Sequence, residues 1–194
     1  MGGMGLARRA ALEDGHRAVT RKPRPTNRVE TVVTFLEMTA DPRNHVPSPA
    51  NVRLTLLKAE TPPVHFYRYL YDTVGRSLHW IDRKALGDTE LRAAIHDRGT
   101  DIFVLYVGGV PAGFYEVDHR TDDVELKYFG LVDEFRGRGI GRWLLAEAIA
   151  TCWSHAPRRV HVETCTLDSP AALHLYQRLG FTPCGRENKV ITLS

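Results

Sequence analysis

One stretch constrains the fold of this chain more than any other, because in it a strand must end and a helix must begin within a few residues. Residues 131–142 join a β-rich segment to a helical one, and from position 136 onward they intersperse glycine with arginine. Glycine lets the backbone approach a ligand without a Cβ, and the first amides of a helix are unpaired and positively polarised. The sequence therefore predicts an anion-binding turn, most naturally for a pyrophosphate. Its glycines are Gly137, Gly139 and Gly141, and its arginines are Arg136, Arg138 and Arg142.

Other phosphate-binding motifs fit this turn poorly. A Walker A loop requires Gly-Lys-Ser/Thr, and the turn contains no lysine. A dinucleotide-binding fingerprint starting at Gly137 requires glycine or alanine at position 142, where the chain has Arg142. A tight connection without a ligand does not explain three glycines, since each costs about 1 kcal/mol relative to alanine within a helix.

The order of the remaining elements predicts an α/β (α+β) fold. Apolar alternation and turn residues such as Gly108-Gly109 predict three consecutive strands joined by hairpins. Such a meander, followed by strand–helix–strand units, predicts a mixed sheet with helices on both faces. The expected strands are 29–39, 52–56, 101–107, 111–119, 124–132, 159–167 and one or two in 181–193; the expected helices are 62–74, 88–97, 140–156 and one capped by Ser169 with Pro170 first and Gly180 after its end.

The charge is concentrated at the start of the chain. Residues 1–30 contain seven basic and three acidic residues, a net charge of +4, whereas the rest carries −1 of the total of +3. Pro23 and Pro25 exclude a helix or central strand there. We expect a disordered basic extension over 1–28 and a domain over 29–194. Nucleic-acid binding by the extension is the less favoured alternative, since it has no aromatic residue to stack on bases.

Composition places the chain among globular proteins with a substantial core. Of its 194 residues 43% are hydrophobic, and no run of about 18 apolar residues predicts a membrane span. The first residues lack the apolar segment of a secretory signal. Three cysteines without metal-ligand spacing are typical of reduced thiols. These features predict a cytoplasmic protein that does not bind membranes.

Two motifs in the expected order resemble those of the GNAT superfamily of N-acetyltransferases. Arg136, Gly139 and Gly141 match its acyl-CoA signature, in which Arg or Gln is followed after two residues by Gly, any residue, and Gly or Ala. The segment 170–181 is similar to the closing motif of the family, although Ser169 replaces the usual asparagine. The matching residues there are Ala172, Leu175, Tyr176, Gly180 and Phe181. The resemblance covers about residues 52–185.

The resemblance implies the GNAT fold, with a mostly antiparallel mixed sheet of six to eight strands, and acetyl-CoA as co-substrate. Residues 136–142 would hold its pyrophosphate, and the strand 128–132 would bond to its pantetheine arm in an opening between that strand and 159–167. An N–H near Leu131 would face the thioester oxygen. The implied cofactor-binding residues are Phe129, Gly130, Leu131, Val132, Arg136, Gly137, Arg138, Gly139, Ile140, Gly141, Arg142 and Ser169. Gly130 supports this, since glycine inside a strand marks a bulge or a close approach.

The chemistry requires a proton acceptor and a proton donor. An alkylammonium with a pKa of about 10.4 must lose a proton before it attacks, which costs about 4.6 kcal/mol at pH 7. We expect Glu125 to assist as base, with Glu116 on the neighbouring strand as the alternate, although strand alternation also pairs Glu125 with Lys127. A reaction without any base stays open. Tyr176 aligns with the general-acid tyrosine of the family.

Aromatic and acidic residues suited to an ammonium ligand gather before the meander. The expected acceptor residues are Tyr71, Trp80, Asp82 and Glu116. Among the nine histidines none shows a paired metal-binding spacing, so no metal is expected.

The resulting prediction is N-acetylation of a primary amine on a small molecule, by direct attack on acetyl-CoA in a ternary complex. The alternatives are acetylation of a protein lysine or N-terminus and a non-catalytic acyl-CoA sensor. The family resemblance also makes a homodimer through the C-terminal strands an expectation.

Overall fold

A seven-stranded mixed sheet forms the centre of the molecule. The computed structural model describes residues 27–78 and 80–193, and the predicted extension over 1–28 lies almost wholly outside them. The strand order is β2-β3-β4-β5-β6-β1-β7. β5 and β6 run parallel, and the other neighbouring strands run antiparallel. The strands are β1 Asn27–Met38, β2 Leu54–Lys58, β3 Thr100–Val107, β4 Val110–Asp118, β5 Asp123–Leu131, β6 Arg159–Cys165 and β7 Thr182–Leu193.

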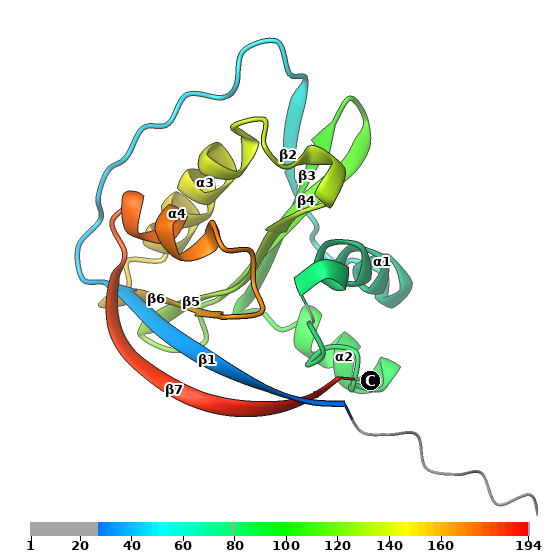
Figure 1. The fold of residues 1–194 in the computed structure, drawn as a ribbon. Coiled ribbons are helices and arrows are strands. Elements are labelled where there is room, and N and C mark those ends of the chain that lie inside the picture. Colours follow the sequence, from blue (N-terminus) through cyan, green and yellow to red (C-terminus); the bar gives the residue numbers. More distant parts are fainter. Residues whose placement is uncertain (1–26, 79, 194) are drawn as a thin grey trace, which may run out of the picture.

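Four α-helices cover the two faces of the sheet (Figure 1). They are α1 Val64–Gly75, α2 Asp88–Ile95, α3 Ile140–Ser154 and α4 Ala172–Arg178. α3 and α4 pack on one face over a large apolar cluster, and α1 and α2 pack on the other over a second cluster. This arrangement confirms the predicted mixed, mostly antiparallel sheet with helices on both faces.

The predicted cap of the C-terminal helix was wrong: the N-cap is Ala171 and not Ser169, and no side chain caps the helix. α4 starts at Ala172, two residues after Pro170, because the amide of Ala172 first bonds to the carbonyl of Ser169 at 2.8 Å in a turn. Gly180 has φ +109° and follows the end of the helix, as the capping pattern predicted. None of the helices in the described residues is long and apolar enough to span a membrane.

β1 and β7 form a long curved pair at one side of the molecule (Figure 1). The tail forms one strand, and β1 lies between β6 and β7. β1 bonds to β6 through Val33–Met38 and to β7 along most of its length. The first and last strands of the domain therefore close the sheet together.

The sheet opens between β5 and β6. These strands pair at three positions, Asp123 with Arg159, Val124 with Val160 and Glu125 with His161. β5 then continues to Leu131 and β6 to Cys165 without pairing to each other. The opening expected from the sequence is therefore present, and the facing edges of two central strands border it.

A β-bulge at Lys127 reverses the alternation of β5. The register with β4 shifts between Glu116 and Val117, so that Lys127 has no partner on β4. Leu126 and Phe129 consequently both pack with the cluster under α3, whereas Tyr128 packs with the cluster under α1. Strict alternation from Glu125 would place Phe129 on the same face as that glutamate, but Phe129 lies on the opposite face because the alternation does not continue through the bulge.

Gly130 marks a close approach between β5 and helix α1. A Cβ built on Gly130 would lie 2.5 Å from Cγ1 of Val74. The sequence predicted a bulge or a close approach at this glycine. The bulge lies three residues earlier, and the approaching group is the side chain of α1.

We expect Gly130→Ala to lower the free energy of unfolding by about 1–3 kcal/mol, since the new methyl overpacks against Val74. Urea unfolding measures this change. Gly185→Ala is the matched control, because its Cβ would lie at an ordinary 3.5 Å from Cδ2 of Phe35. In a protein that also carries Val74→Ala, Gly130→Ala should lower the free energy of unfolding by less than it does alone. If the losses caused by the two substitutions simply add, the contact between these residues is contradicted.

Candidate active site

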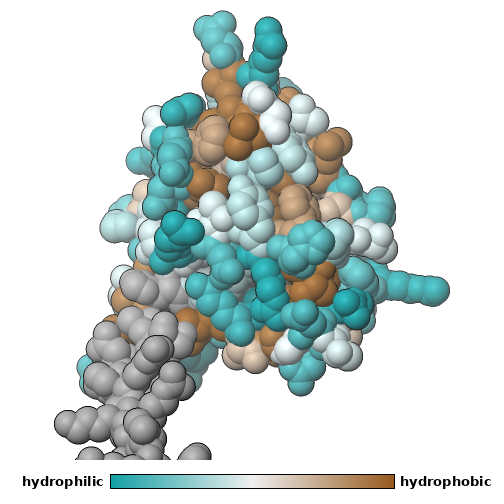
Figure 2. Space-filling model, turned by 90° about the vertical axis from the view of Figure 1, so that its right-hand side faces the viewer, coloured by the Kyte–Doolittle hydropathy of each residue, from teal (hydrophilic) through white to brown (hydrophobic). Residues whose placement is uncertain are grey.

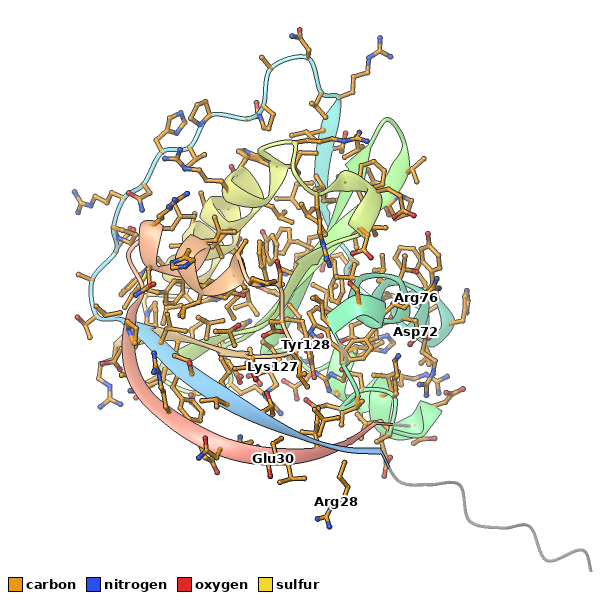
Figure 3. The ribbon with its side chains drawn as sticks, in the orientation of Figure 1. Arg28, Glu30, Asp72, Arg76, Lys127 and Tyr128 are labelled. Carbon is orange, nitrogen blue, oxygen red and sulfur yellow. The ribbon has the colours of Figure 1, made fainter. Side chains whose placement is uncertain are left out.

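A cavity of about 450 Å³ lies in the opening between β5 and β6. Both strands, α4, the start of α3, the segment after α1, and the β1–β7 pair contribute to its walls. Lys127 and Tyr128 of β5 lie in the middle of the molecule, between the β1–β7 pair and α1 (Figure 3). Predicted site residues in the lining are Tyr71, Trp80, Asp82, Glu125, Phe129, Gly130, Leu131, Arg136, Gly137, Gly141, Ser169 and Tyr176.

The glycine-rich turn forms one end of the cavity. Gly137 and Gly139 both have φ +76°, a left-handed conformation that favours glycine. Gly139 is the N-cap of α3, and the first turn of that helix contains no acidic residue. Added Cβ atoms at these two glycines would meet nothing within 4 Å. The turn is thus an open approach to the positive end of a fifteen-residue helix.

The arginines of the turn differ in their roles. Arg136 lines the cavity, donates from Nε to the carbonyl of Leu131 at 3.2 Å, and pairs with Asp133 at 2.8 Å. The guanidinium of Arg138 stacks on the ring of Phe135 at 5.6 Å. Arg142 is exposed. Arg136 therefore links the turn to β5.

The backbone of Leu131 faces the opening. The amide of Val132 donates to Ala112 on the β4 side at 2.9 Å. Because successive amides of a strand point to opposite edges, the N–H and the carbonyl of Leu131 both point toward the β6 side. The carbonyl of Leu131 accepts a hydrogen bond from the side chain of Arg136, and the N–H of Leu131 points into the cavity.

Tyr176 of α4 lies on the wall next to β5. Its ring packs edge-on against Phe129 at 6.2 Å and Phe181 at 5.7 Å, and the residue is buried. Burial raises the pKa of the Tyr176 hydroxyl well above its usual value, and the nearby charge of Asp168 raises it further. The phenol is therefore protonated across the neutral pH range.

Glu125 lies where β5 and β6 separate. Its side chain is 18% exposed, and both carboxylate oxygens accept from Nζ of Lys127, at 3.0 and 3.1 Å. The carboxylate thus already binds an alkylammonium inside the cavity wall.

An aromatic cluster lines the cavity near Glu125. The ring centroids of Tyr71, Trp80 and Tyr128 lie 5.1–5.3 Å from one another. Burial raises the pKa of Tyr71 to about 12. Asp82 is exposed at the rim. Acidic and aromatic groups together make this end suitable for a cation.

Comparison with known proteins agrees with this geometry. The Acetyltransferase (GNAT) family model matches residues 60–181, which is more than half of the chain. The chain belongs to the GNAT family of acetyltransferases. The match includes the turn, the opening and α4, whereas β1, β2 and β7 lie outside it.

Several solved structures share the fold at low identity. A GCN5-related N-acetyltransferase from Sphaerobacter thermophilus is 18% identical, with a TM-score of 0.57 over 87% of this chain and 53% of that one. The aminoglycoside N-acetyltransferase AAC(6')-Iy, solved with CoA, is 19% identical, with a TM-score of 0.53 over 73% and 95%. A functionally unknown conserved protein from Staphylococcus epidermidis is 20% identical, with a TM-score of 0.54 over 86% and 63%. This chain thus spans less than two thirds of two of these relatives. No curated protein matches its sequence.

Some of the predicted site residues do not line the cavity. Glu116 lies outside the lining and is 1% exposed, and its carboxylate binds Arg83 and the hydroxyl of Tyr67. Burial raises the pKa of Glu116, and the charge of Arg83 opposes that rise. The side chain of Ile140 is buried in the core. Residues outside the lining, whose backbone can still contribute to the turn, are Val132, Arg138, Gly139, Ile140 and Arg142.

Other lining residues were missed in the sequence. No motif marks Thr31 and Val33 of β1 or Lys189 and Ile191 of β7, which reach the cavity only through the insertion of β1 beside β6. Glu163 and Thr164 lie in β6, which was expected to border the opening, but they were not among the expected site residues.

We expect Gly139→Ala to weaken CoA binding about tenfold, because a side chain at this φ costs about 1–2 kcal/mol. Isothermal titration calorimetry measures the affinity. Gly141→Ala is the matched control, since Gly141 lacks a positive φ and its Cβ would lie 3.6 Å from Leu131 and 4.0 Å from Leu175. The affinity of the control for CoA should stay within about threefold of that of the unaltered protein. Equal losses of affinity in both variants would contradict the role of the turn conformation.

Glu116→Gln should lower the free energy of unfolding by about 3–5 kcal/mol, because it leaves Arg83 as a buried charge without its partner. The KM for the acceptor should not change, since Glu116 does not reach the cavity. Asp72→Asn is the control: its ion pair with Lys84 is exposed and contributes about 1 kcal/mol or less. A raised acceptor KM with unchanged stability in Glu116→Gln would restore Glu116 as an acceptor ligand.

Proposed function

We propose that the enzyme transfers the acetyl group of acetyl-CoA to a primary amine of a small molecule by direct attack in a ternary complex. One observation carries this proposal: a single cavity connects the anion-binding turn of α3 with an acidic and aromatic end, through the opening of the sheet. A ligand extending from one end to the other would place its thioester beside the acceptor.

The described residues fit CoA. The open amides at 137–142 suit its pyrophosphate, with Arg136 adding positive charge. The facing edges of β5 and β6 suit the amides of its pantetheine arm, which can pair with the backbone of Phe129 as an added strand does. Bound acetyl-CoA supplies an activated acetyl thioester. The N–H of Leu131 is placed to stabilise negative charge on the thioester oxygen.

Glu125 receives the acceptor and assists its deprotonation. Lys127 occupies the position where an incoming ammonium would bind, so the acceptor replaces one alkylammonium with another. A proton passes from the acceptor nitrogen to Glu125, directly or through water, and the neutral amine attacks the acetyl carbon. As the new C–N bond forms, the C–S bond breaks, its electron pair leaves on sulfur, and the nitrogen loses its second proton to solvent to give the neutral amide.

Tyr176 stabilises the leaving sulfur. Its hydroxyl is protonated at neutral pH and lies in the cavity wall next to β5. A thiol of pKa about 8.5 leaves as a thiolate near neutral pH, and a hydrogen bond from the phenol lowers the cost of that charge. The phenol then delivers a proton to sulfur and is reprotonated from solvent.

The acceptor end favours a small, cationic molecule. The β1–β7 pair encloses it on one side with Thr31 and Lys189, whereas Asp82 and Glu163 provide negative charge. The aminoglycoside enzyme among the structural neighbours supports a polyamine-like or aminosugar acceptor. Because β1 and β7 lie outside the family match, they would set the choice of acceptor.

The free thiols Cys152, Cys165 and Cys184 support the expected cytoplasmic location.

A thiol-release screen tests the function. Acetyl-CoA is incubated with panels of amino acids, polyamines, aminoglycosides and peptides, and free CoA is detected. We expect turnover with a small di- or polyamine. Turnover confined to peptides would assign a protein acetyltransferase, and CoA binding without release on any panel would assign a sensor.

We expect Tyr176→Phe to lower kcat about 100-fold or more while the affinity for acetyl-CoA stays within about threefold, because only the proton donor is lost. Steady-state kinetics and calorimetry measure the two quantities. Tyr69→Phe changes an exposed tyrosine of α1 and should leave both unchanged. Undiminished turnover in Tyr176→Phe would reject the donor role.

Glu125→Gln should lower kcat/KM about 100-fold at pH 7 and recover as the pH rises toward the pKa of the acceptor, where more of the amine is already neutral. A pH–rate profile from pH 6 to pH 10 measures this. The control Glu187→Gln changes an exposed glutamate of β7 and should have the same pH–rate profile as the unaltered enzyme. Parallel profiles for Glu125→Gln and the unaltered enzyme would show that no base acts at this position.

A further inference from the structure

Two histidines and an aspartate meet at the end of α3 that lies opposite the glycine-rich turn. Asp101 is in β3, His119 follows β4, and His155 is the C-cap of α3. One donor atom of each lies within 4.8 Å of the others. Oδ2 of Asp101 is 3.1 Å from Nε2 of His155 and 3.7 Å from Nε2 of His119. None of the three lines the cavity.

The cluster contains an unsatisfied donor atom. Nε2 of His119 is buried and makes no hydrogen bond in the described residues. Buried polar atoms without a partner destabilise the folded state and are rare, so this unpaired nitrogen indicates a position where a ligand can bind. The side chains of Asp101, His119 and His155 are 11%, 20% and 25% exposed, which leaves a path for an ion from solvent.

We propose that Asp101, His119 and His155 form a binding site for a divalent transition-metal ion of the zinc class. Two imidazole nitrogens and one carboxylate oxygen are the donors that such ions prefer, whereas Mg²⁺ and Ca²⁺ prefer oxygen. In a tetrahedral zinc site with metal–ligand bonds of about 2.1 Å, neighbouring ligand atoms lie about 3.4 Å apart. The two distances to Oδ2 of Asp101 bracket this value.

Lys58 orients the carboxylate of Asp101 for binding a metal ion. Its Nζ lies 2.9 Å from Oδ1 of Asp101, so Oδ2 is left to face the histidines. Such contacts behind a ligand fix its orientation. The two imidazole rings are stacked at 3.7 Å, and they must turn out of this stacking so that both lone pairs point at one ion.

The site would stabilise the domain and take no part in acetyl transfer. An ion there would join the start of β3, the end of β4 and the end of α3, which are distant in sequence. Binding to the folded state alone raises the melting temperature by mass action.

Calorimetry on the full, untagged chain after treatment with EDTA tests the proposal. We expect Zn²⁺ to bind with one-to-one stoichiometry and to raise Tm, and Mg²⁺ to do neither. The double variant His119→Ala/His155→Ala should lose this binding. The control His65→Ala/His174→Ala, which removes two exposed histidines, should retain it. No heat with Zn²⁺, or one-to-one binding that persists in the His119/His155 variant, would overturn the proposal.

A second measurement needs no variant. In the unaltered protein, Zn²⁺ should shift the imidazole resonances of His119 and His155 in NMR spectra and leave those of His65 and His174 in place. Shifts confined to other histidines would overturn the proposal, even if the double variant failed to fold.

Discussion

The separation of β5 from β6 after three paired residues is the constraint on which the rest of the structure depends. Folded proteins leave few backbone N–H and C=O groups unpaired away from water. A parallel pair that stops early therefore presents donors and acceptors to any extended ligand containing amides. The strands on either side keep the opening in place, because β4 pairs with β5 and β1 pairs with β6.

Two local features of β5 distribute the site over both faces of the sheet. The bulge at Lys127 directs Phe129 toward Tyr176 under α4 and Tyr128 toward Trp80 beside α1. Gly130 then lets α1 approach the strand. The proposed proton donor and the aromatic acceptor wall thus come from opposite helical layers and meet in the opening. The mosaic of hydrophilic and hydrophobic residues on the α1–α2 side is seen in Figure 2.

Local signals in the sequence were sufficient for much of this structure. The turn at 136–142, the hairpin at Gly108-Gly109 and the glycine after α4 depend on backbone conformation, which neighbouring residues determine. The insertion of β1 beside β6 depends on the whole sheet, so the residues of β1 and β7 in the cavity could not be found. The sequence does not distinguish Glu116 from other strand glutamates, because its contact with Arg83, 33 residues earlier, forms only in the folded chain. The histidines at 119 and 155 likewise meet only through the fold, since no short spacing joins them.

A crystal structure of the protein with CoA and an unreactive acceptor amine would show whether the opening of the sheet holds the cofactor. We expect that amides of residues 137–142 donate to the pyrophosphate and that the pantetheine arm lies between β5 and β6, beside Phe129 and Leu131. Nucleotide bound elsewhere on the protein, or a complex in which β5 and β6 pair along their whole length, would contradict it.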